Sequence, residues 1–167
     1  NSFQPAEDIA SLRSHLRHRD SLIEYKAAHI QHIQKALMLM NLQVHHVVSD
    51  ITGVTGMRIV RAIVAGERDA RILASFRDVR CKSSLETIEK SLIGNYKAEH
   101  LLLLRHALEL CDHYQQKIDE CDQQVELILQ QLQLGRCPPE EALDKHRHRT
   151  KQPNDPKFDA RSYLYRI

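Results

Sequence analysis

Apolar residues recur every seven positions through residues 1–49, and this spacing constrains the fold more than any other feature of the sequence. The first position of each heptad is aliphatic: Ile9, Leu16, Ile23, Ile30, Leu37 and Val44. The position three residues later is also mostly apolar. Because sustained apolar occupancy of both positions is typical of a coiled coil, we predict a helix from about Pro5 to about Ser49. Such a helix would be roughly 65–70 Å long at 1.5 Å per residue.

Two basic residues interrupt this first seam. Arg19 and Lys26 occupy the second heptad position, where apolar residues are expected. Their aliphatic stems could cover apolar surface while the charges reach solvent. Alternatively, the charges could fix the register of the helices or the choice of partner. Solvent-reaching charges are the commoner arrangement, but the sequence leaves both interpretations open.

A second heptad pattern occupies residues 97–134 and predicts a second long helix. Its first position holds Leu104, Cys111, Ile118, Val125 and Leu132. Gly135, followed by two prolines, would end this helix. Two such helices separated by a shorter segment predict an all-α fold, a long antiparallel coiled-coil hairpin with a small helical tip, followed by an irregular linker.

Residues 50–96 would form the helical tip. Several of the few glycines fall in this segment and divide it into short elements. The predicted helices cover residues 55–65, 69–76 and 84–92. Gly66 and Gly94 would end the first and the last of these helices, and Ser83 with Glu86 forms a capping-box pattern at the start of the last.

The remainder of the chain changes in character. Residues 135–159 are rich in proline and charge, lack an apolar period, and are predicted to form a linker. Residues 160–167 start a new apolar pattern, as expected for the beginning of a C-terminal domain. Since the chain also opens at Asn1 without methionine, we expect it to be a segment of a longer protein.

Composition agrees with a mainly helical protein and excludes several classes. Aromatic residues are only 5%, tryptophan is absent, and glycine and proline number five each, so the core must be aliphatic and turns are few. No two of the four cysteines have C-x-x-C spacing and no signal peptide is visible, which favours reduced thiols. No apolar run approaches the length of a membrane-spanning helix. The net charge of +2 indicates no partner by itself.

No catalytic residue and no metal site are predicted. The adjacent carboxylate pairs lie in predicted helices or the linker, and neighbours on a helix point apart. His15 with His18, and His29 with His32, have a spacing compatible with metal binding. However, no zinc-protease motif surrounds them and no cysteine is nearby. We interpret these histidines as polar helix-surface residues and expect no cofactor in this segment.

Basic residues gather in the tip and in the linker, where they could contact nucleic acid. Between residues 58 and 82, seven basic residues stand against three acidic ones. Such clusters suit phosphate backbones, although they also occur on ordinary solvated surfaces. The candidate contacts are Arg58, Arg61, Arg68, Arg71, Arg77, Arg80 and Lys82 in the tip, and Lys145, Arg147, Arg149 and Lys151 in the linker. The stretch ITGVTGM also loosely resembles a phosphate-binding helix-hairpin-helix loop, although any tight turn favours glycine.

Two long stretches carry a resemblance to a known family. HIQHIQKALMLMNLQVHHVVSDITGVTGMRIVRAIVAGERD, together with RCKSSLETIEKSLIGNYKAEHLLLLRHALELCDHYQQKIDECD, closely resembles the middle of transposases of the insertion-sequence 110 family. The likeness covers nearly the whole chain, from Ser2 to the terminal NDPKFDARSYLYRI. It is a long colinear run rather than a short motif.

This resemblance implies a DNA recombinase of bacteria or archaea. The family has an N-terminal RuvC-like domain with four acidic residues that usually bind Mg²⁺, then a coiled-coil region, then a domain with a nucleophilic serine. This chain would be the coiled-coil region with its linker, so no catalytic residue carries over to it. The implied partners are element-end and target DNA, further copies of the chain and, in some members, an element-encoded guide RNA. The implied location is the cytoplasm, on the nucleoid when bound to DNA.

Two alternatives stay open at this point. The chain could be a coiled-coil scaffold that binds only protein, or an inactive remnant of a transposase. A metal-dependent enzyme that uses the histidine pairs is a third and poorer interpretation. The seams could pair within one chain or between chains, because a heptad seam is satisfied by either.

Overall fold

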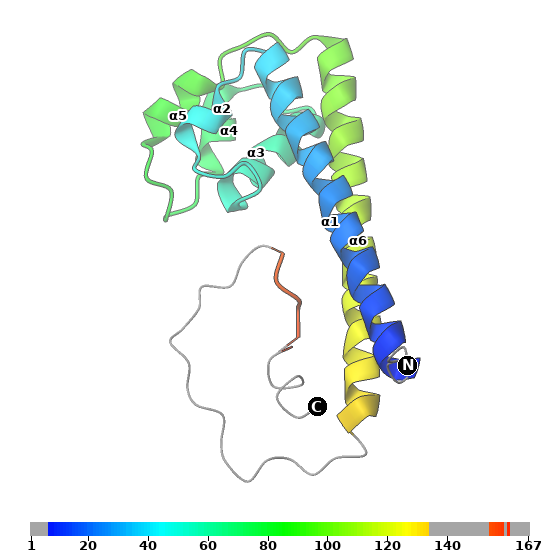
Figure 1. The fold of residues 1–167 in the computed structure, drawn as a ribbon. Helices are drawn as coiled ribbons and strands as arrows, with labels where there is room; N and C mark the ends of the chain where they lie inside the picture. Colours follow the sequence, from blue (N-terminus) through cyan, green and yellow to red (C-terminus); the bar gives the residue numbers. More distant parts are fainter. Residues whose placement is uncertain (1–6, 134–153, 159, 161–167) are drawn as a thin grey trace. The chain divides into compact units, whose positions relative to one another are not determined.

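The structure, a computed structural model, describes residues 7–133, 154–158 and 160. The helices in this part of the chain are α1 (Glu7–Leu39), α2 (Val44–Val47), α3 (Val54–Val64), α4 (Ala70–Ser75), α5 (Leu85–Ser91) and α6 (Ala98–Gln133). No strand occurs among these described residues, which confirms the all-α prediction (Figure 1). Nearly all of the predicted linker, and most of the predicted start of a following domain, lie outside the described residues.

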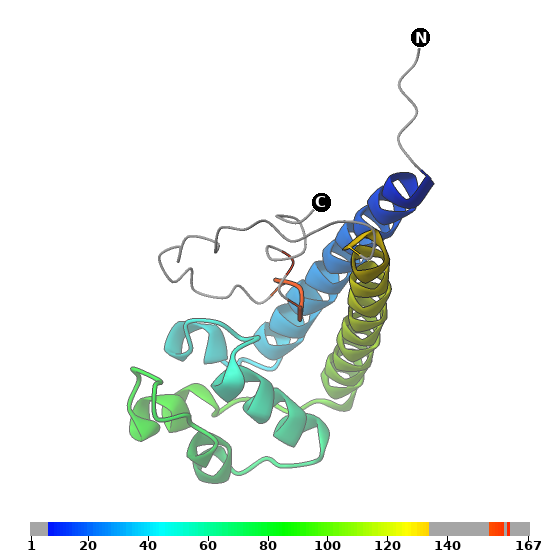
Figure 2. The ribbon, with the colours of Figure 1, turned by 90° about the horizontal axis from the view of Figure 1, so that it is seen from below.

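The chain divides into two compact units. We call residues 26–112 the central unit and residues 1–25 with 113–167 the terminal unit. Each unit contains part of α1 packed against part of α6, side by side in both ribbon views (Figures 1 and 2). Within the terminal unit, the early Leu12 clusters with the late Leu129, which is the antiparallel arrangement predicted for a helical hairpin.

The predicted seam is confirmed more fully on α6 than on α1. On α6, the seam residues Leu104, Cys111, Ile118 and Val125 are buried, and Leu132 is partly buried. On α1, Leu37 is buried, whereas Ile9, Ile23 and Ile30 are only partly buried and Leu16 is 39% exposed. The buried positions of α1 fall mainly three residues later in the heptad, at Leu12, Arg19 and Ile33. In this part of α1, the heptad position of Leu12 and Arg19 is the one that faces α6. Leu16 belongs to the other heptad position and therefore lies outside the seam.

The first long helix ends ten residues earlier than predicted, at Leu39. Asn41 adopts a positive φ of 58° and stops the helix. The N–H of Leu42 donates to the Leu37 carbonyl, and the N–H of Asn41 donates to the Met38 carbonyl. This is the Schellman pattern that closes many helices. The apolar period continues past the break because Val44, at the start of the separate helix α2, is also buried.

The tip has its own apolar core within the central unit. Helix α4 packs on α5, α2 packs on α5, and α3 packs on α4, and the ribbon views show these helices beside the α1 and α6 segments of the same unit (Figures 1 and 2). The fully buried side chains of the tip include Ile59, Ile63, Leu73, Ile88 and Leu92. These residues belong to the same cluster as Leu37 and Leu104, so the tip and the hairpin segments of this unit share one core.

Two glycines serve close approach between backbone segments. A Cβ at Gly56 would lie 2.3 Å from the carbonyl oxygen of Ile51, and a Cβ at Gly94 would lie 2.2 Å from the carbonyl oxygen of Met40. Gly94 was predicted to end a helix, but that helix ends earlier, with Leu92 as its C-cap. Glycine is required at this position for another reason: the Met40 carbonyl, just past the end of α1, leaves no room for a side chain.

The short helices of the tip match their predicted ranges closely, but one cap was predicted wrongly. The N-cap of α5 is Ser84, whose hydroxyl accepts a hydrogen bond from the Thr87 N–H. Ser83 instead donates its hydroxyl to the carbonyl of Val47, 2.6 Å away. Asp69 caps α4 in the same manner as Ser84 caps α5. Helices α3 and α6 also agree with their predicted ranges to within about one residue.

A buried ion pair links α1 and α6 in the terminal unit. Arg19 and Asp122 are only 6% and 3% exposed, and the Arg19 Nε donates to the Asp122 carboxylate at 2.5 Å. Arg19 also donates to the carbonyl of Asn154, and the backbone N–H of Lys157 donates to Asp122. The charge of Arg19 therefore does not reach solvent. Of the two interpretations of this residue, the specific pairing that fixes register is the one the structure supports.

Candidate nucleic-acid interface

The seven basic residues predicted in the tip differ in what they contact, and two of them stabilise the tip itself. Arg77 donates from Nε to the Ser83 carbonyl and from Nη2 to the Cys81 carbonyl, both at 2.6 Å. It therefore braces the loop between α4 and α5. Because both acceptors are backbone groups of its own loop, this guanidinium is held away from an external phosphate.

Arg68 has a similar internal role at the end of α3. Its Nη1 donates to the carbonyls of Ile63 and Glu67, at 2.5 and 2.6 Å. A cation is favourable there, because the last carbonyls of a helix carry partial negative charge. The guanidinium also lies over the Tyr96 ring, 5.0 Å from its centroid. Sequence patterns did not reveal this role, because it depends on how the chain turns after Gly66.

Arg61 and Arg80 form ion pairs at the surface. Arg61 donates to both carboxylate oxygens of Asp112, at 2.7 and 2.6 Å, and this hydrogen bonding raises the pKa of Arg61. Arg80 donates to Asp78 at 2.9 Å, and its hydrogen bonds lower the pKa of that carboxyl. Solvent-exposed pairs of this kind contribute little to stability, because water and salt screen the attraction. A phosphate could therefore compete for these two guanidinium groups.

The remaining basic residues of the tip, Arg58, Arg71 and Lys82, are all exposed. Arg58 and Lys82 are exposed, and the charge of Arg58 contributes to lowering the pKa of Asp78. The Arg71 side chain is 83% exposed and approaches Glu89 only to 3.9 Å. The structure therefore brings Arg58 and Arg80 together around Asp78, and leaves Arg71 and Lys82 open to solvent.

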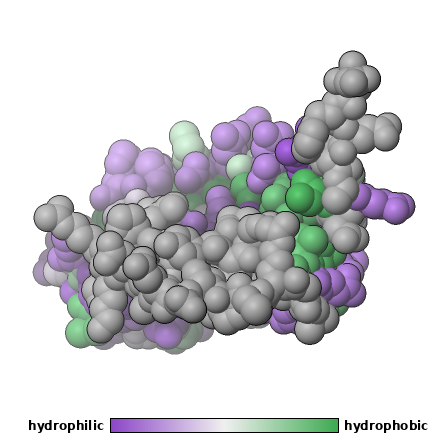
Figure 3. Space-filling model, turned by 60° about the horizontal axis from the view of Figure 1, so that its bottom comes forward, coloured by the Kyte–Doolittle hydropathy of each residue, from purple (hydrophilic) through white to green (hydrophobic). Residues whose placement is uncertain are grey.

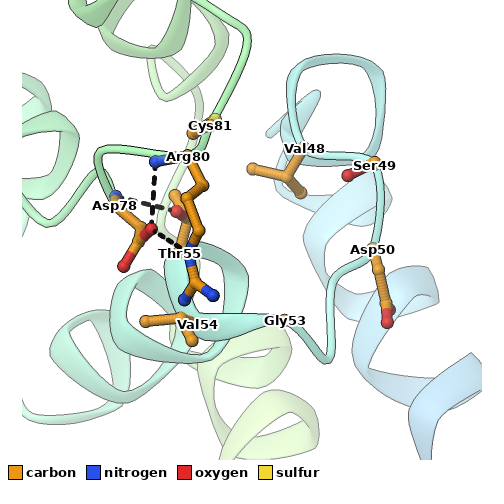
Figure 4. Close-up of a pocket in the computed structure, with 9 residues that line it drawn as sticks. All are labelled: Val48, Ser49, Asp50, Gly53, Val54, Thr55, Asp78, Arg80 and Cys81. Carbon is orange, nitrogen blue, oxygen red and sulfur yellow. Dashed lines mark hydrogen bonds and ion pairs between the residues drawn. The ribbon is translucent and has the colours of Figure 1, made fainter. Parts of the chain in front are cut away.

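A small pocket lies next to this group, between the loop that precedes α3 and the loop that follows α4 (Figure 4). Its volume is about 160 Å³, and it is lined by Val48, Ser49, Asp50, Gly53, Val54, Thr55, Asp78, Arg80 and Cys81. The Thr55 hydroxyl accepts a hydrogen bond from the Asp78 N–H at 3.0 Å, which joins the first turn of α3 to the loop that follows α4. Figure 4 shows the Arg80 side chain lying across Thr55 toward Val54.

Gly53, Val54 and Thr55, in the middle of the stretch ITGVTGM that was compared with a phosphate-binding loop, line the same pocket. Gly53 is the N-cap of α3, and its N–H donates to the Asp50 carbonyl. The Asp50 carboxylate also accepts from the N–H and the hydroxyl of Thr52. Because Asp50 and Asp78 line the pocket together with Arg80, a phosphate inside it would meet two carboxylates and one guanidinium, which already pairs with Asp78. We therefore place the candidate contacts on the exposed cations outside the pocket.

The linker part of the predicted site cannot be placed. Lys145, Arg147, Arg149 and Lys151 lie outside the described residues. In the part of the chain that the structure describes, no three His, Cys, Asp or Glu side chains come together as metal ligands. The Mg²⁺ that the family resemblance implies was expected in the RuvC-like domain and not in this segment. No helix of the described residues is both long and apolar enough to cross a membrane.

Two cysteines of α6, Cys111 and Cys121, do not resemble catalytic nucleophiles. Cys111 and Cys121 are buried, and burial raises the pKa of both thiols. A raised pKa keeps the thiol protonated and unreactive at neutral pH. Both residues lie where small apolar side chains are expected, in the seam of α6, which agrees with their interpretation as core residues.

No protein-family model, curated protein or solved structure matches this chain. The resemblance to insertion-sequence 110 transposases therefore rests on the residues quoted for it, and membership of that family stays a prediction.

Proposed function

We propose that this chain is the central assembly and nucleic-acid-contact region of a DNA transposase or recombinase. In this proposal it connects a RuvC-like nuclease domain to a serine-bearing domain, and those domains carry the catalytic groups and the Mg²⁺. The segment would be inactive alone. The family resemblance supports this function, and so does the combination of a helical hairpin with a compact tip whose surface carries several accessible cations.

The observation that carries the proposed nucleic-acid contact is the exposure of Arg58, Arg71 and Lys82 on the tip. Among the described residues, these side chains have no hydrogen-bonded partner that would compete with phosphate, in contrast to Arg68 and Arg77. Contacts of this kind bind the backbone of DNA or RNA without reading its sequence. Each neutralised phosphate releases counterions, so the affinity should fall steeply as salt rises.

The test is a triple charge reversal, Arg58→Glu with Arg71→Glu and Lys82→Glu. The affinity falls as salt rises, so log affinity plotted against log salt has a negative slope. We expect this slope to become shallower by about 3 units on duplex DNA, because each lost phosphate contact removes about 0.9 from its magnitude. Fluorescence anisotropy between roughly 50 and 200 mM salt measures this slope. Arg61, Arg68 and Arg77 are left unchanged because their side chains hold carboxylate or backbone groups of the central unit.

The matched control reverses three exposed basic residues outside the tip helices, Arg13→Glu, Arg17→Glu and Lys97→Glu. The control has the same net charge as the tip variant, so a general loss of attraction to DNA would affect both equally. Equal affinities and equal salt slopes for the two variants would show that the tip makes no specific contact, and would overturn this part of the proposal.

A protein-binding scaffold is a second candidate function, and one observation favours it. Large apolar side chains reach the surface of the long helices among hydrophilic ones (Figure 3), including Leu16, Leu39, Leu103, Leu110 and Leu127. If the unaltered chain showed no salt-dependent binding to DNA or RNA, the scaffold function would be the better explanation.

A further inference from the structure

A groove runs between α1 and α6 within the central unit, away from the basic residues of the tip. It has a volume of about 410 Å³ and is lined by His29, His32, Lys35, Ala36 and Leu39 of α1 and by Leu103, His106, Ala107 and Leu110 of α6. We call it the His–Leu groove. The sequence drew attention only to His29 and His32 among these residues, as a histidine pair with a spacing compatible with metal binding.

Small and large apolar residues give this groove its shape. Ala36 and Ala107 are buried and form its floor, where the two helices lie close together. Leu39, Leu103 and Leu110 are 43%, 52% and 42% exposed and form its walls. Exposed apolar side chains that surround a depression mark an interaction site more often than isolated ones do. The small floor leaves room for a side chain of an incoming helix, as in knobs-into-holes packing.

The charges in the groove have one sign. Its titratable lining groups are His29, His32 and Lys35 on α1 and His106 on α6, and no carboxylate lines it. Burial, and then the neighbouring His32, lower the pKa of His29, so that imidazole is mostly neutral at neutral pH. Lys35, His32 and His106 bring no negative charge to the groove. The groove therefore complements carboxylates.

We propose that the His–Leu groove docks an acidic amphipathic helix of a protein partner. Its apolar side chains would lie over Ala36 and Ala107 between the leucines, and its carboxylates would face the imidazoles and Lys35. The α1 part of the lining spans residues 29–39, about 15 Å or three helical turns. That length suits a short helix laid into a groove, a common mode of peptide recognition.

The geometry disfavours other occupants. A small molecule would stay largely exposed between half-exposed leucines, whereas ligand pockets enclose most of their ligand. Nucleic acid would gain nothing from the three leucines. A twofold interface joins identical surfaces. A second copy bound through the same groove would therefore place the histidines and Lys35 of one chain against the histidines and Lys35 of the other. This inference goes beyond the proposed function, because the groove shares no residue with the tip cations.

The experiment uses a synthetic helical peptide of about 15 residues, with leucines at every third or fourth position and glutamates beside them. A matched peptide carries lysine in place of each glutamate. We expect the glutamate peptide to bind the full chain at least about tenfold more tightly than the lysine peptide, a difference of about 1.4 kcal/mol.

Two variants test the residues themselves. Leu103→Ser with Leu110→Ser should weaken binding of the glutamate peptide at least about tenfold, and Lys35→Glu with His106→Glu should invert the preference toward the lysine peptide. Leu16→Ser with Leu127→Ser is the matched control, because these leucines are also about half exposed but lie in the terminal unit. All substituted leucines are partly exposed, and circular dichroism checks that each variant keeps its helices.

Four results would overturn the proposal. The first is an absence of binding by the glutamate peptide. The second is equal binding of the two peptides, and the third is binding that ignores the Leu103 and Leu110 substitutions. The fourth is a self-associated chain that dissociates when these leucines are substituted, because a second copy would then occupy the groove. The triple charge reversal in the tip should leave peptide binding unchanged, so the failure of one proposal can be distinguished from the failure of the other.

Discussion

Arginines in this chain differ mainly in what their guanidinium groups contact. Arg19 is buried against Asp122, Arg77 donates to backbone carbonyls of its own loop, and Arg71 is almost fully exposed. The sequence does not separate these cases, because the partner of Arg19 lies 103 positions away along the chain. The carbonyls that hold Arg77 are likewise set by the path of a loop. Counting basic residues therefore overestimated how many cations of the tip are available to phosphate.

The buried pair of Arg19 and Asp122 predicts an asymmetric response to substitution. Arg19→Met should destabilise the fold by about 3–5 kcal/mol, because it leaves the Asp122 carboxylate buried without its partner. Replacing both residues, Arg19→Met with Asp122→Leu, should recover much of this loss. Urea denaturation measures the free energy of unfolding, and the exposed Arg13→Met serves as the control. A double variant no more stable than the single one would show that the two residues do not act as a pair.

His29 should make stability depend on pH. Because its pKa is lowered in the folded state, the unfolded chain binds more protons just below the ordinary histidine pKa of about 6.5. Neutral His29 therefore stabilises the fold at pH values above about 6.5. This stabilisation decreases as the pH falls below 6.5 and toward the lower pKa of the folded state. Denaturation between about pH 5 and 8 should show a smaller loss for His29→Gln than for the unaltered chain. Parallel curves for the two proteins would contradict this assignment.

At the scale of secondary structure, glycines and capping residues predicted the ends of α3, α4 and α5 well. The heptad pattern of residues 1–49 did not predict where α1 ends. Gly66, Asp69 and Gly135 stand at or next to the ends of predicted helices, and α3, α4 and α6 follow them closely. The end of α1 was missed because the apolar period continues into Val44, which is buried for a different reason, as part of the tip. The face of α1 that packs against α6 was also predicted incorrectly. It contains Arg19, and a buried arginine cannot be recognised from the sequence without knowing its partner, Asp122.

Asn41 should be the residue that ends α1. Its φ of 58° is tolerated by asparagine and glycine but is unfavourable for a β-branched residue. We expect Asn41→Gly to leave stability nearly unchanged and Asn41→Val to lower it by about 1–2 kcal/mol. Thermal denaturation followed by circular dichroism distinguishes the two variants. If Asn41→Val were as stable as Asn41→Gly, the helix would end for another reason.

For the molecule as a whole, the division into two units separates the candidate functions. The central unit contains the tip cations and the His–Leu groove, whereas the terminal unit contains the buried ion pair. The residues of the largest core cluster, from Ile30 to Cys111, all belong to the central unit. A core made entirely from its own residues is the main physical requirement for a unit to fold alone. Both proposed binding surfaces should therefore survive without the terminal unit.

This argument predicts that residues 26–112 fold when expressed as a separate fragment. The fragment should be largely helical and should unfold in a single cooperative transition, because its apolar cluster is retained intact. Leu37→Asp should abolish that transition, since Leu37 is 2% exposed and a buried unpaired charge costs several kcal/mol, whereas Leu39→Asp, at a half-exposed position, should preserve it. Circular dichroism against temperature measures all three fragments. A gradual, non-cooperative transition in the unaltered fragment would mean that the central unit depends on the terminal unit for its packing, and the two binding surfaces would then have to be tested only in the full chain.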